Sequence, residues 1–577
     1  MTGRLVQVAC AALLVLASLT GDAPPASASS PPSFVRVLSD EDVTTYKALF
    51  AAAAKGDKAQ VAALAAQVKN RSLMGHVSAK GYLSPQTSAA FDDLKAWLAK
   101  YPDYPEADRI HALAERKDPK RAGELKSATQ RIVRGFGEDA NEMPPDFEDP
   151  KATAAGSKLR SMISNGQVNG AAAFVESAEV KGRLSKTDYG KLTTQVAAAQ
   201  YYLGDAKTAL ALAQRVAEDS RAQVPDADWV AGLAAFKLKQ YDVGATHFAA
   251  MADNTATTSW LRSAAAFWAA RCYMASQEPQ NVSRMLEIAA EKPRTFYGLI
   301  ALRLLGKTPP FTWSEPELER AGFQRLVKVS GISRGVALYQ VGEMESAEGS
   351  IARAHGRLSS EMDRPFIALA HDLGFAHIQL LAAGAARSAD LKAAAYPVMG
   401  FKPTDGWTVD PALVHAIVRQ ESKFEMRVTS TSEARGLMQL LPSTAAGVMK
   451  DTTLDNPGAK ARLFDPAFNL SVGQKYLAKM FDFAEPNGNL FHLVVAYNAG
   501  PGNLQKWLRE IDFNGDPLLF IESIPSRETR GYVERVVANY WIYQDRMGAS
   551  QVTLDQVARG EWPVMPGIGH HRVASLW

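Results

Sequence analysis

The feature that most constrains the fold of this chain is a long stretch of helical periodicity. From about Asp40 to Leu391, Ala and Leu recur at helical spacing with few strand-like alternations. Helix-breaking residues return roughly every ten to twenty positions. Helices with this pattern bury their apolar faces against one another. We therefore predict that the first two thirds of the chain is helical.

Weak repeats between positions 192 and 286 indicate how these helices stack. Leu203 and Leu238 lie in similar turns 35 residues apart, and Trp229 and Trp260 begin comparable helices 31 residues apart. Such spacing is typical of helix pairs stacked into a solenoid. An irregular helical bundle is the alternative. We predict an α-helical superhelix over residues 29–395, of which a closed ring is one form.

The pattern changes between Tyr396 and Gly406, where Pro and Gly cluster and helical periodicity stops. We place a domain boundary there, so that a second, more irregular helical domain spans 396–548 and a tail spans 549–577. The tail contains His570 and His571. Two histidines are too few ligands for zinc, so we expect them to be exposed, and we predict no metal and no cofactor.

The N-terminus has the parts of a secretory signal peptide. Arg4 precedes an apolar stretch from Leu5 to Leu19, and Ala26–Ala28 forms a small-residue cleavage motif. The apolar stretch is shorter than the roughly 20 residues of a membrane span. We expect residues 1–28 to be removed, leaving no stable membrane span. A lipoprotein is the alternative, but Cys10 lies ahead of most of the apolar stretch.

Charge and cysteine content argue against several classes of protein. The 64 Lys and Arg residues against 61 Asp and Glu leave a net charge of +3, which is too small to indicate a nucleic-acid partner. After cleavage Cys272 is the one remaining cysteine. The exported chain must then be stabilised by packing, without an internal disulfide. We expect Cys272 to be a buried small side chain and not a catalytic thiol.

One carboxylate of the second domain continues an apolar helix face. Asp410 and Pro411 form a helix start. Glu421 extends the stripe formed by Leu413, Val414, Ile417 and Val418. A carboxylate directed toward a core holds its proton more tightly, as a general acid must near neutral pH. From periodicity alone, however, an ion-paired or capping glutamate is the favoured interpretation.

Four ordered sequence blocks reverse that preference. They are Glu421–Phe424 with Gly436–Pro442; Asn469, Gly473, Tyr476 and Leu477; Ala496–Gly502; and Ile524–Pro525 with Glu528–Val533. Together they resemble the catalytic domain of the soluble lytic murein transglycosylases. Phe296–Leu299 also resembles the end of the helical superhelix that precedes this domain in the family.

The resemblance implies an all-α protein in which the superhelix is followed by a lysozyme-like catalytic domain. It implies a lytic transglycosylase of cell-wall turnover or remodelling, whose partners are the glycan strands of peptidoglycan. In such an enzyme Glu421 protonates the oxygen between N-acetylmuramic acid and N-acetylglucosamine. The ionised carboxylate then takes the proton of the muramic 6-hydroxyl as that oxygen closes on the anomeric carbon. The product is a 1,6-anhydromuramic end, formed without water.

The resemblance further implies a periplasmic location in a Gram-negative bacterium, with cell-wall enzymes as partners of the helical domain. It also assigns substrate-binding positions. Met438 and Gln439 match positions that line the glycan groove, although Met438 would also suit a core. Tyr497 and Asn498 match positions beside the reacting sugar, and Tyr532 matches one whose hydroxyl approaches the catalytic carboxyl.

We also predict roles for three further residues near these motifs. We place Ser422 in the substrate site as a support for Glu421, since no His or Lys base is positioned to make it a nucleophile. Glu433 stands where these enzymes commonly have glycine, and Glu425 where a small polar residue is common. Both are interpreted as solvated loop residues. If Glu433 reached the groove, it would be a second carboxylate and favour hydrolysis.

Two other functions remain open at this point. A hydrolysing muramidase of goose-lysozyme type would share the helical domain and deliver water to the anomeric carbon. A non-catalytic peptidoglycan-binding scaffold would use its solenoid to recruit partner proteins. Because a solenoid of this length exceeds what a catalytic groove needs, we hypothesise that it curls around the catalytic domain.

Overall fold

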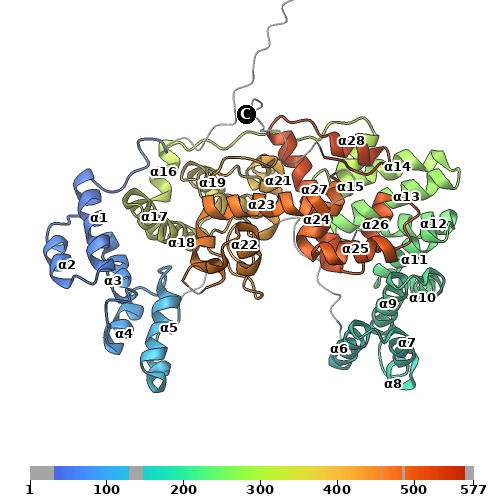
Figure 1. Cartoon of the computed structure of the whole chain (residues 1–577), viewed down its shortest axis with the longest axis horizontal. Helices are drawn as coiled ribbons and strands as arrows, with labels where there is room; N and C mark the ends of the chain where they lie inside the picture. Colours follow the sequence, from blue (N-terminus) through green and yellow to red (C-terminus); the bar gives the residue numbers. More distant parts are fainter. Residues whose placement is uncertain are drawn as a thin grey trace, which may run out of the picture.

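The computed structural model describes residues 31–128, 147, 149–255, 257–456, 458–483 and 488–565 (Figure 1). These ranges contain helices, loops and a few isolated β-bridges, and no β-strand. The predicted all-α class is therefore confirmed. None of the helices within them has the length and apolar character needed to cross a membrane. The predicted signal peptide, Cys10 and the pair His570 and His571 lie outside the described residues.

The first helices form a limb at one side of the molecule (Figure 1, blue). Its apolar residues meet in a small core, where Trp97 donates from Nε1 to the Gly75 carbonyl at 2.9 Å and so joins two of the helices. The elements are α1 (Asp40–Ala54), α2 (Lys58–Ala65), η1 (Arg71–Leu73), α3 (Met74–Tyr82), α4 (Phe91–Lys100), α5 (Ala107–Lys117) and η2 (Pro119–Glu124).

The next helices form the predicted solenoid on the opposite side. From α9 onward each helix packs mainly on the next one along the chain. The repeat marked by Trp229 and Trp260 corresponds to α11 and α13. Cys272 on α13 is free and fully buried, as predicted. The elements are α6 (Pro150–Ser164), α7 (Val168–Glu176), α8 (Ala178–Lys181), α9 (Lys186–Tyr202), α10 (Ala206–Ser220), α11 (Asp226–Lys237), α12 (Tyr241–Asp253), α13 (Ser259–Ala275), α14 (Pro279–Ala290) and α15 (Phe296–Leu304).

A helix-free segment over 307–319 then leads the chain back to the first side. Trp313 in this segment donates from Nε1 to Asp545 Oδ1 at 2.6 Å. The helices that follow join the N-terminal limb, because Gln340 Oε1 accepts from the backbone nitrogens of Val37 and Leu38 at 2.9 and 3.0 Å. They are α16 (Arg320–Leu326), α17 (Ser330–Val341), α18 (Met344–His355), η4 (Ser360–Met362), α19 (Asp363–Asp372), α20 (Ala376–Ala385) and η5 (Ala389–Ala395).

The C-terminal helices lie between these two sides. Between η5 and the next helix, over 396–410, the chain is irregular, which is the segment where we placed the boundary. The long helix α27 is central and packs against α21, α24 and α15. The elements are α21 (Pro411–Glu421), α22 (Pro442–Met449), η6 (Thr452–Asp455), η7 (Lys460–Phe464), α23 (Pro466–Phe483), α24 (Leu490–Ala499), α25 (Pro501–Glu510), α26 (Pro517–Ser523), α27 (Arg527–Arg546) and α28 (Val552–Ala558).

The segment assigned to a tail begins as packed structure. Helix α28 lies against α15 of the solenoid. Beyond it, Leu490 N donates to the Pro563 carbonyl at 2.8 Å, and Met565 N donates to the Gly488 carbonyl at 3.0 Å. The buried side chains of Leu554 and Met565 explain this packing, because leaving them exposed would cost free energy.

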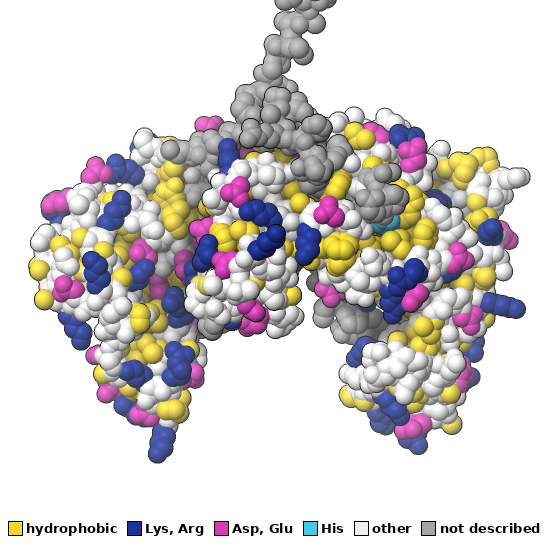
Figure 2. All heavy atoms as spheres, in the orientation of Figure 1, with side chains coloured by type: hydrophobic (Ala, Val, Ile, Leu, Met, Phe, Trp, Pro, Cys, Tyr) yellow, Lys and Arg dark blue, Asp and Glu magenta, His cyan; other side chains and the backbone are white. Residues whose placement is uncertain are grey.

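The helical domain flanks the C-terminal domain on both sides, giving an arch in Figures 1 and 2. Two arms, α4–α5 and α6–α8, lie apart at its open side. Whether the chain closes a ring there depends on residues 129–146, which lie outside the described residues. On the face seen in Figure 2, basic and acidic side chains are interspersed over both arms.

One continuous apolar core joins the solenoid to the C-terminal domain. Phe296 of α15 stacks on Trp541 of α27, with ring centroids 5.3 Å apart and an interplanar angle of 13°. Polar contacts reinforce this junction. Tyr201 and Ser523 are hydrogen-bonded through their hydroxyls at 3.0 Å, and Arg303 pairs with Asp555. The two domains are therefore held in a defined relative position.

Loss of the Phe296 ring should destabilise both domains together. Because the ring is fully buried at the junction, we expect Phe296→Ala to lower the free energy of unfolding by about 3–5 kcal/mol. Thermal unfolding followed by circular dichroism measures this change. Leu203→Ala, at a side chain that is 65% exposed, is the control and should change stability by less than about 0.5 kcal/mol. Equal melting temperatures for Phe296→Ala and wild type would contradict the expectation.

Candidate active site

Glu421 is the last residue of α21 and is half-buried against α27. The Tyr532 hydroxyl donates to Glu421 Oε1 at 2.6 Å. Burial raises the pKa of the Glu421 carboxyl to about 7; the Tyr532 hydrogen bond opposes this rise, and the negative charge of Glu528 adds to it. Burial also raises the pKa of Tyr532 well above its ordinary value, so the hydroxyl stays protonated. One carboxyl group is thus poised to donate and accept a proton near neutral pH.

The turn after Glu421 fixes where α21 ends. Ser422 is buried, and its hydroxyl donates to the Val418 carbonyl at 3.1 Å and accepts from Phe424 N at 3.2 Å. Lys423 and Phe424 have positive φ angles of 52° and 65°, a conformation that is unfavourable for non-glycine residues. His377 of α20 donates from Nδ1 to the Lys423 carbonyl at 2.8 Å. The helical domain therefore supports the backbone beside the carboxyl.

Met438 and Gln439 belong to a folded loop beside this turn. Met438 is fully buried, and a Cβ at Gly473 would lie 2.0 Å from its Sδ atom. Gln439 has a φ of 46° and donates from Nε2 to the Gly436 carbonyl at 2.9 Å. Asn469 accepts from Met438 N at 2.9 Å. Both predicted groove residues are thus engaged with the protein itself.

Tyr497 and Asn498 lie near the end of α24. Tyr497 is buried and donates from its hydroxyl to the Met438 carbonyl at 2.8 Å. Asn498 Oδ1 accepts from the Thr529 hydroxyl at 2.9 Å. Gly500 follows with a φ of +83°, which a residue with a Cβ would adopt only under strain. The motif around these residues therefore connects the Met438 loop to α27.

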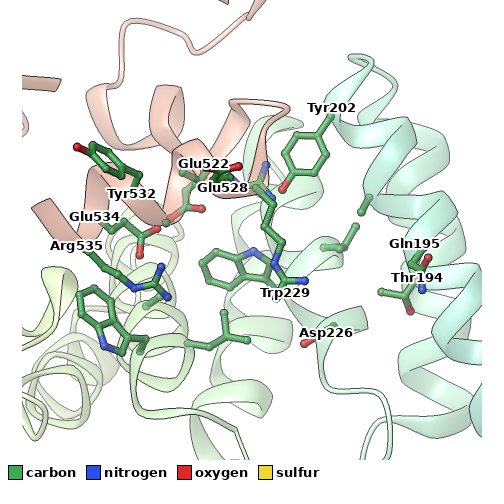
Figure 3. A pocket seen from close by; sticks show the side chains of 18 of the residues that line it. Thr194, Gln195, Tyr202, Asp226, Trp229, Glu522, Glu528, Tyr532, Glu534 and Arg535 are labelled. Carbon is green, nitrogen blue, oxygen red and sulfur yellow. The ribbon is translucent and has the colours of Figure 1, made fainter. Parts of the chain in front are cut away.

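A cavity of about 850 Å³ lies between the C-terminal domain and the solenoid. Of the predicted site residues, Glu421, Asn498 and Tyr532 line it, whereas Ser422, Met438, Gln439 and Tyr497 are not in its wall. Figure 3 shows Tyr532, Glu534 and Arg535 on the left, and Trp229 and Asp226 of the solenoid farther to the right. The wall residues for which sequence analysis proposed no site role include Arg160, Lys191, Tyr202, Trp229, Trp260, Glu522, Glu528, Arg530 and Arg535.

The two unusual glutamates lie outside this cavity. Glu433 is exposed and pairs with Arg435 at 2.9 Å and Lys460 at 3.5 Å. The hydrogen bond from Arg435 and the charge of Lys460 hold its pKa below the ordinary value. Its φ of 67° explains why glycine would suit this position. Glu425 is exposed as well. The carboxylate whose charge acts on Glu421 is instead Glu528.

The described residues hold no cluster of three or more His, Cys, Asp or Glu side chains that could bind a metal ion.

Comparison with known proteins agrees with the motifs. Residues 399–518 match the family described as Transglycosylase SLT domain. Over 168 residues the chain is 33% identical to the soluble lytic murein transglycosylase of Salmonella typhimurium, covering 29% of this chain and 25% of that protein. For the soluble lytic murein transglycosylase of Escherichia coli K12, the identity is 37% over 145 residues, or 25% of this chain and 22% of that protein. The chain thus spans about a quarter of the length of these curated relatives.

Solved structures extend the similarity to the helical domain. The 70 kDa soluble lytic transglycosylase of Escherichia coli has a TM-score of 0.55 at 16% identity, over 88% of this chain and 97% of that one. The lytic transglycosylase Slt of Pseudomonas aeruginosa has a TM-score of 0.50 at 18% identity, over 88% and 97%. These likenesses confirm the predicted fold, a superhelix followed by a lysozyme-like domain.

Substitutions on either side of the carboxyl should move its pKa in opposite directions. Tyr532→Phe removes a hydrogen bond to the charged form, so the pKa of Glu421 should rise above about 7. Glu528→Gln removes a nearby negative charge, so that pKa should fall. Infrared difference titration, with Glu421→Gln to identify the carboxyl band, measures both shifts. Shifts of the same sign would contradict this description of the site.

Proposed function

We propose, from the membership of residues 399–518 in the Transglycosylase SLT domain family, that this chain is a peptidoglycan lytic transglycosylase. It cleaves the β-1,4 bond between N-acetylmuramic acid and N-acetylglucosamine without water and leaves 1,6-anhydromuramic ends. The observation that carries this proposal is the Glu421 carboxyl, whose pKa is raised to about 7 at the wall of the interdomain cavity.

In the proposed reaction Glu421 acts twice. Its protonated form donates to the glycosidic oxygen, so that the bond to the anomeric carbon breaks and N-acetylglucosamine leaves as an alcohol. The carboxylate then takes the proton of the muramic 6-hydroxyl while that oxygen bonds to the anomeric carbon, which restores the acid. A pKa near 7 makes both protonation states accessible. Intramolecular attack also benefits from a large effective molarity.

The other predicted site residues divide between two proposed roles. Asn498 and Tyr532 line the cavity, and we assign them to the sugar next to Glu421. The remaining four hold the surrounding backbone and act as positioning residues: Ser422, Met438, Gln439 and Tyr497. This division is supported by the side-chain hydrogen bonds of Ser422, Gln439 and Tyr497 to main-chain carbonyls and by the complete burial of Met438.

The solenoid contributes to the proposed chemistry by covering one side of the cavity. Fewer water molecules near the anomeric carbon favour the internal hydroxyl over hydrolysis.

We propose that the domains divide at residue 396, and that residues 1–28 export the chain to the periplasm for cell-wall turnover. Cell-wall enzymes are the proposed protein partners of the helical domain.

A muramidase is the second candidate, and Glu528 is the observation that favours it. Its charge influences Glu421 and it lines the same cavity. A second carboxylate of this kind could activate water. A non-catalytic scaffold is disfavoured by the perturbed pKa of Glu421.

Product analysis tests the proposed reaction. The mature protein should release anhydromuramic products from purified peptidoglycan, detected by mass spectrometry. Glu421→Gln should lose at least about 10²–10⁴-fold in rate, since the one group that transfers the protons is removed. Activity should be present below pH 7 and fall as the pH rises through about 7, because the acid form is then lost. Reducing-end products would identify a hydrolase, and no release by wild type would favour the scaffold.

Glu433→Gln is expected to leave both the rate and the products unchanged. The side chain is exposed, ion-paired and outside the cavity wall, so it has no access to the reacting atoms. The muropeptide profile of this variant beside that of Glu528→Gln measures the difference between the two carboxylates. Loss of a hydrolytic product in Glu433→Gln would overturn the assignment of Glu433 to the solvated loop.

A further inference from the structure

Two tryptophans of the solenoid share a cavity wall with Glu421. Trp229 lies in the first turn of α11, and Trp260 is the second residue of α13. These helices occupy equivalent places in successive helix pairs of the stack, so the two side chains are presented on the same side. Both line the cavity that Glu421, Asn498 and Tyr532 line from the other domain. We call Trp229 and Trp260 the solenoid platform.

Neighbouring side chains hold the rings of the platform in place, and two buried donor nitrogens at Trp260 and Arg535 have no hydrogen-bond partner within the described part of the chain. Trp229 packs edge-on against the fully buried Phe248, with ring centroids 5.4 Å apart. The Arg535 guanidinium lies over the Trp260 ring, 5.8 Å from its centroid. Among the described residues, neither Trp260 Nε1 nor Arg535 Nε has a hydrogen-bond partner, although both atoms are buried. Buried donors without partners are uncommon in native proteins, and both atoms are shielded from solvent by the packing around them.

The charge of the cavity points to an uncharged ligand surface. Its wall has five basic side chains (Lys and Arg) and five acidic ones (Asp and Glu). A balanced wall of this kind does not attract a polyanion. Flat aromatic faces beside charged and amide side chains suit instead a ligand with an apolar face and polar edges, as a pyranose ring has. Thr194, Gln195 and Asp226 also line the cavity from the solenoid, and Figure 3 shows them to the right of Trp229.

We propose that the solenoid platform binds sugar rings of the glycan strand outside the pair that reacts at Glu421. The strand then lies between the two domains, with the reacting pair at α21 and α27 and further sugars against α11 and α13. The cavity volume of about 850 Å³ is near the upper end of the roughly 300–1,000 Å³ of drug-sized ligand sites. It offers room beyond the reacting sugars. This inference rests on the proposed glycan substrate and assigns the helical domain a direct share of the binding site.

The first test is a binding measurement in the Glu421→Gln protein, which holds the strand without cleaving it. Isothermal titration calorimetry with peptide-free glycan strands of eight sugars compares the full-length parent with Trp229→Ala and Trp260→Ala. Each substitution should weaken binding about tenfold, the loss of roughly 1.4 kcal/mol that one stacked ring accounts for. Phe at either position keeps a flat ring and should retain most of the affinity, whereas Leu keeps apolar volume alone and should not.

Matched controls separate the platform from general damage. Phe401→Ala removes an aromatic side chain that is 37% exposed and lies outside the cavity wall, so it should bind like the parent. Thermal unfolding of every variant establishes that it is folded. With Glu421 intact, the platform variants should raise KM for long strands, leave kcat unchanged, and leave the pH at which activity falls unchanged.

Each outcome bears on one claim. Folded alanine and leucine variants that bind like the parent would overturn the platform and leave the proposed reaction intact. If wild type forms no anhydromuramic product but the platform variants still lose strand binding, the platform stands and the proposed reaction fails. If affinity is lost for peptide-bearing strands and kept for peptide-free ones, the platform binds the peptide and the sugar assignment is wrong.

Discussion

The desolvation of the Glu421 carboxyl is the constraint on which the other features of the site depend. A carboxyl group in water would be ionised at neutral pH and could not act as an acid. Here burial at the end of α21 and the nearby charge of Glu528 raise its pKa to about 7, against the opposing effect of the hydrogen bond from Tyr532 on α27. The strained turn after Glu421 and the hydrogen bonds of Ser422 keep the carboxyl at this place.

The helical domain, including the solenoid, also shapes the surroundings of Glu421. An apolar core continues from the solenoid into α26–α28, and Phe296 stacks on Trp541 across the junction. The opposite side of the helical domain supports the Lys423 carbonyl through His377. The region around Glu421 is thus held from both sides, and the cavity is lined by the solenoid as well as by the C-terminal helices. The helical domain therefore does more than support the C-terminal helices, because it also supplies one wall of the cavity. This second role accounts for its size.

Local patterns in the sequence were sufficient for a large part of this description. Helical periodicity predicts the all-α class, the solenoid and the start of α21 at Pro411, because each depends on residues within a few turns of one another. The spacing of Trp229 and Trp260 reveals the helix repeat. The stripe from Leu413 to Val418 predicts that Glu421 faces away from solvent. Burial of Cys272 also follows from composition and context.

The sequence by itself therefore determined the helical class and the stacking of neighbouring helices, and its motifs, through their resemblance to a family, singled out Glu421 as the predicted acid. Only the tertiary structure decided which motif residues reach the cavity: Asn498 and the buried Tyr532 contribute to its wall, while Met438 and Tyr497 do not. It also placed Trp229 across the cavity from Glu421, although they are far apart in the chain. Periodicity specifies the buried face of a helix, but which faces meet depends on long-range packing that no local pattern encodes.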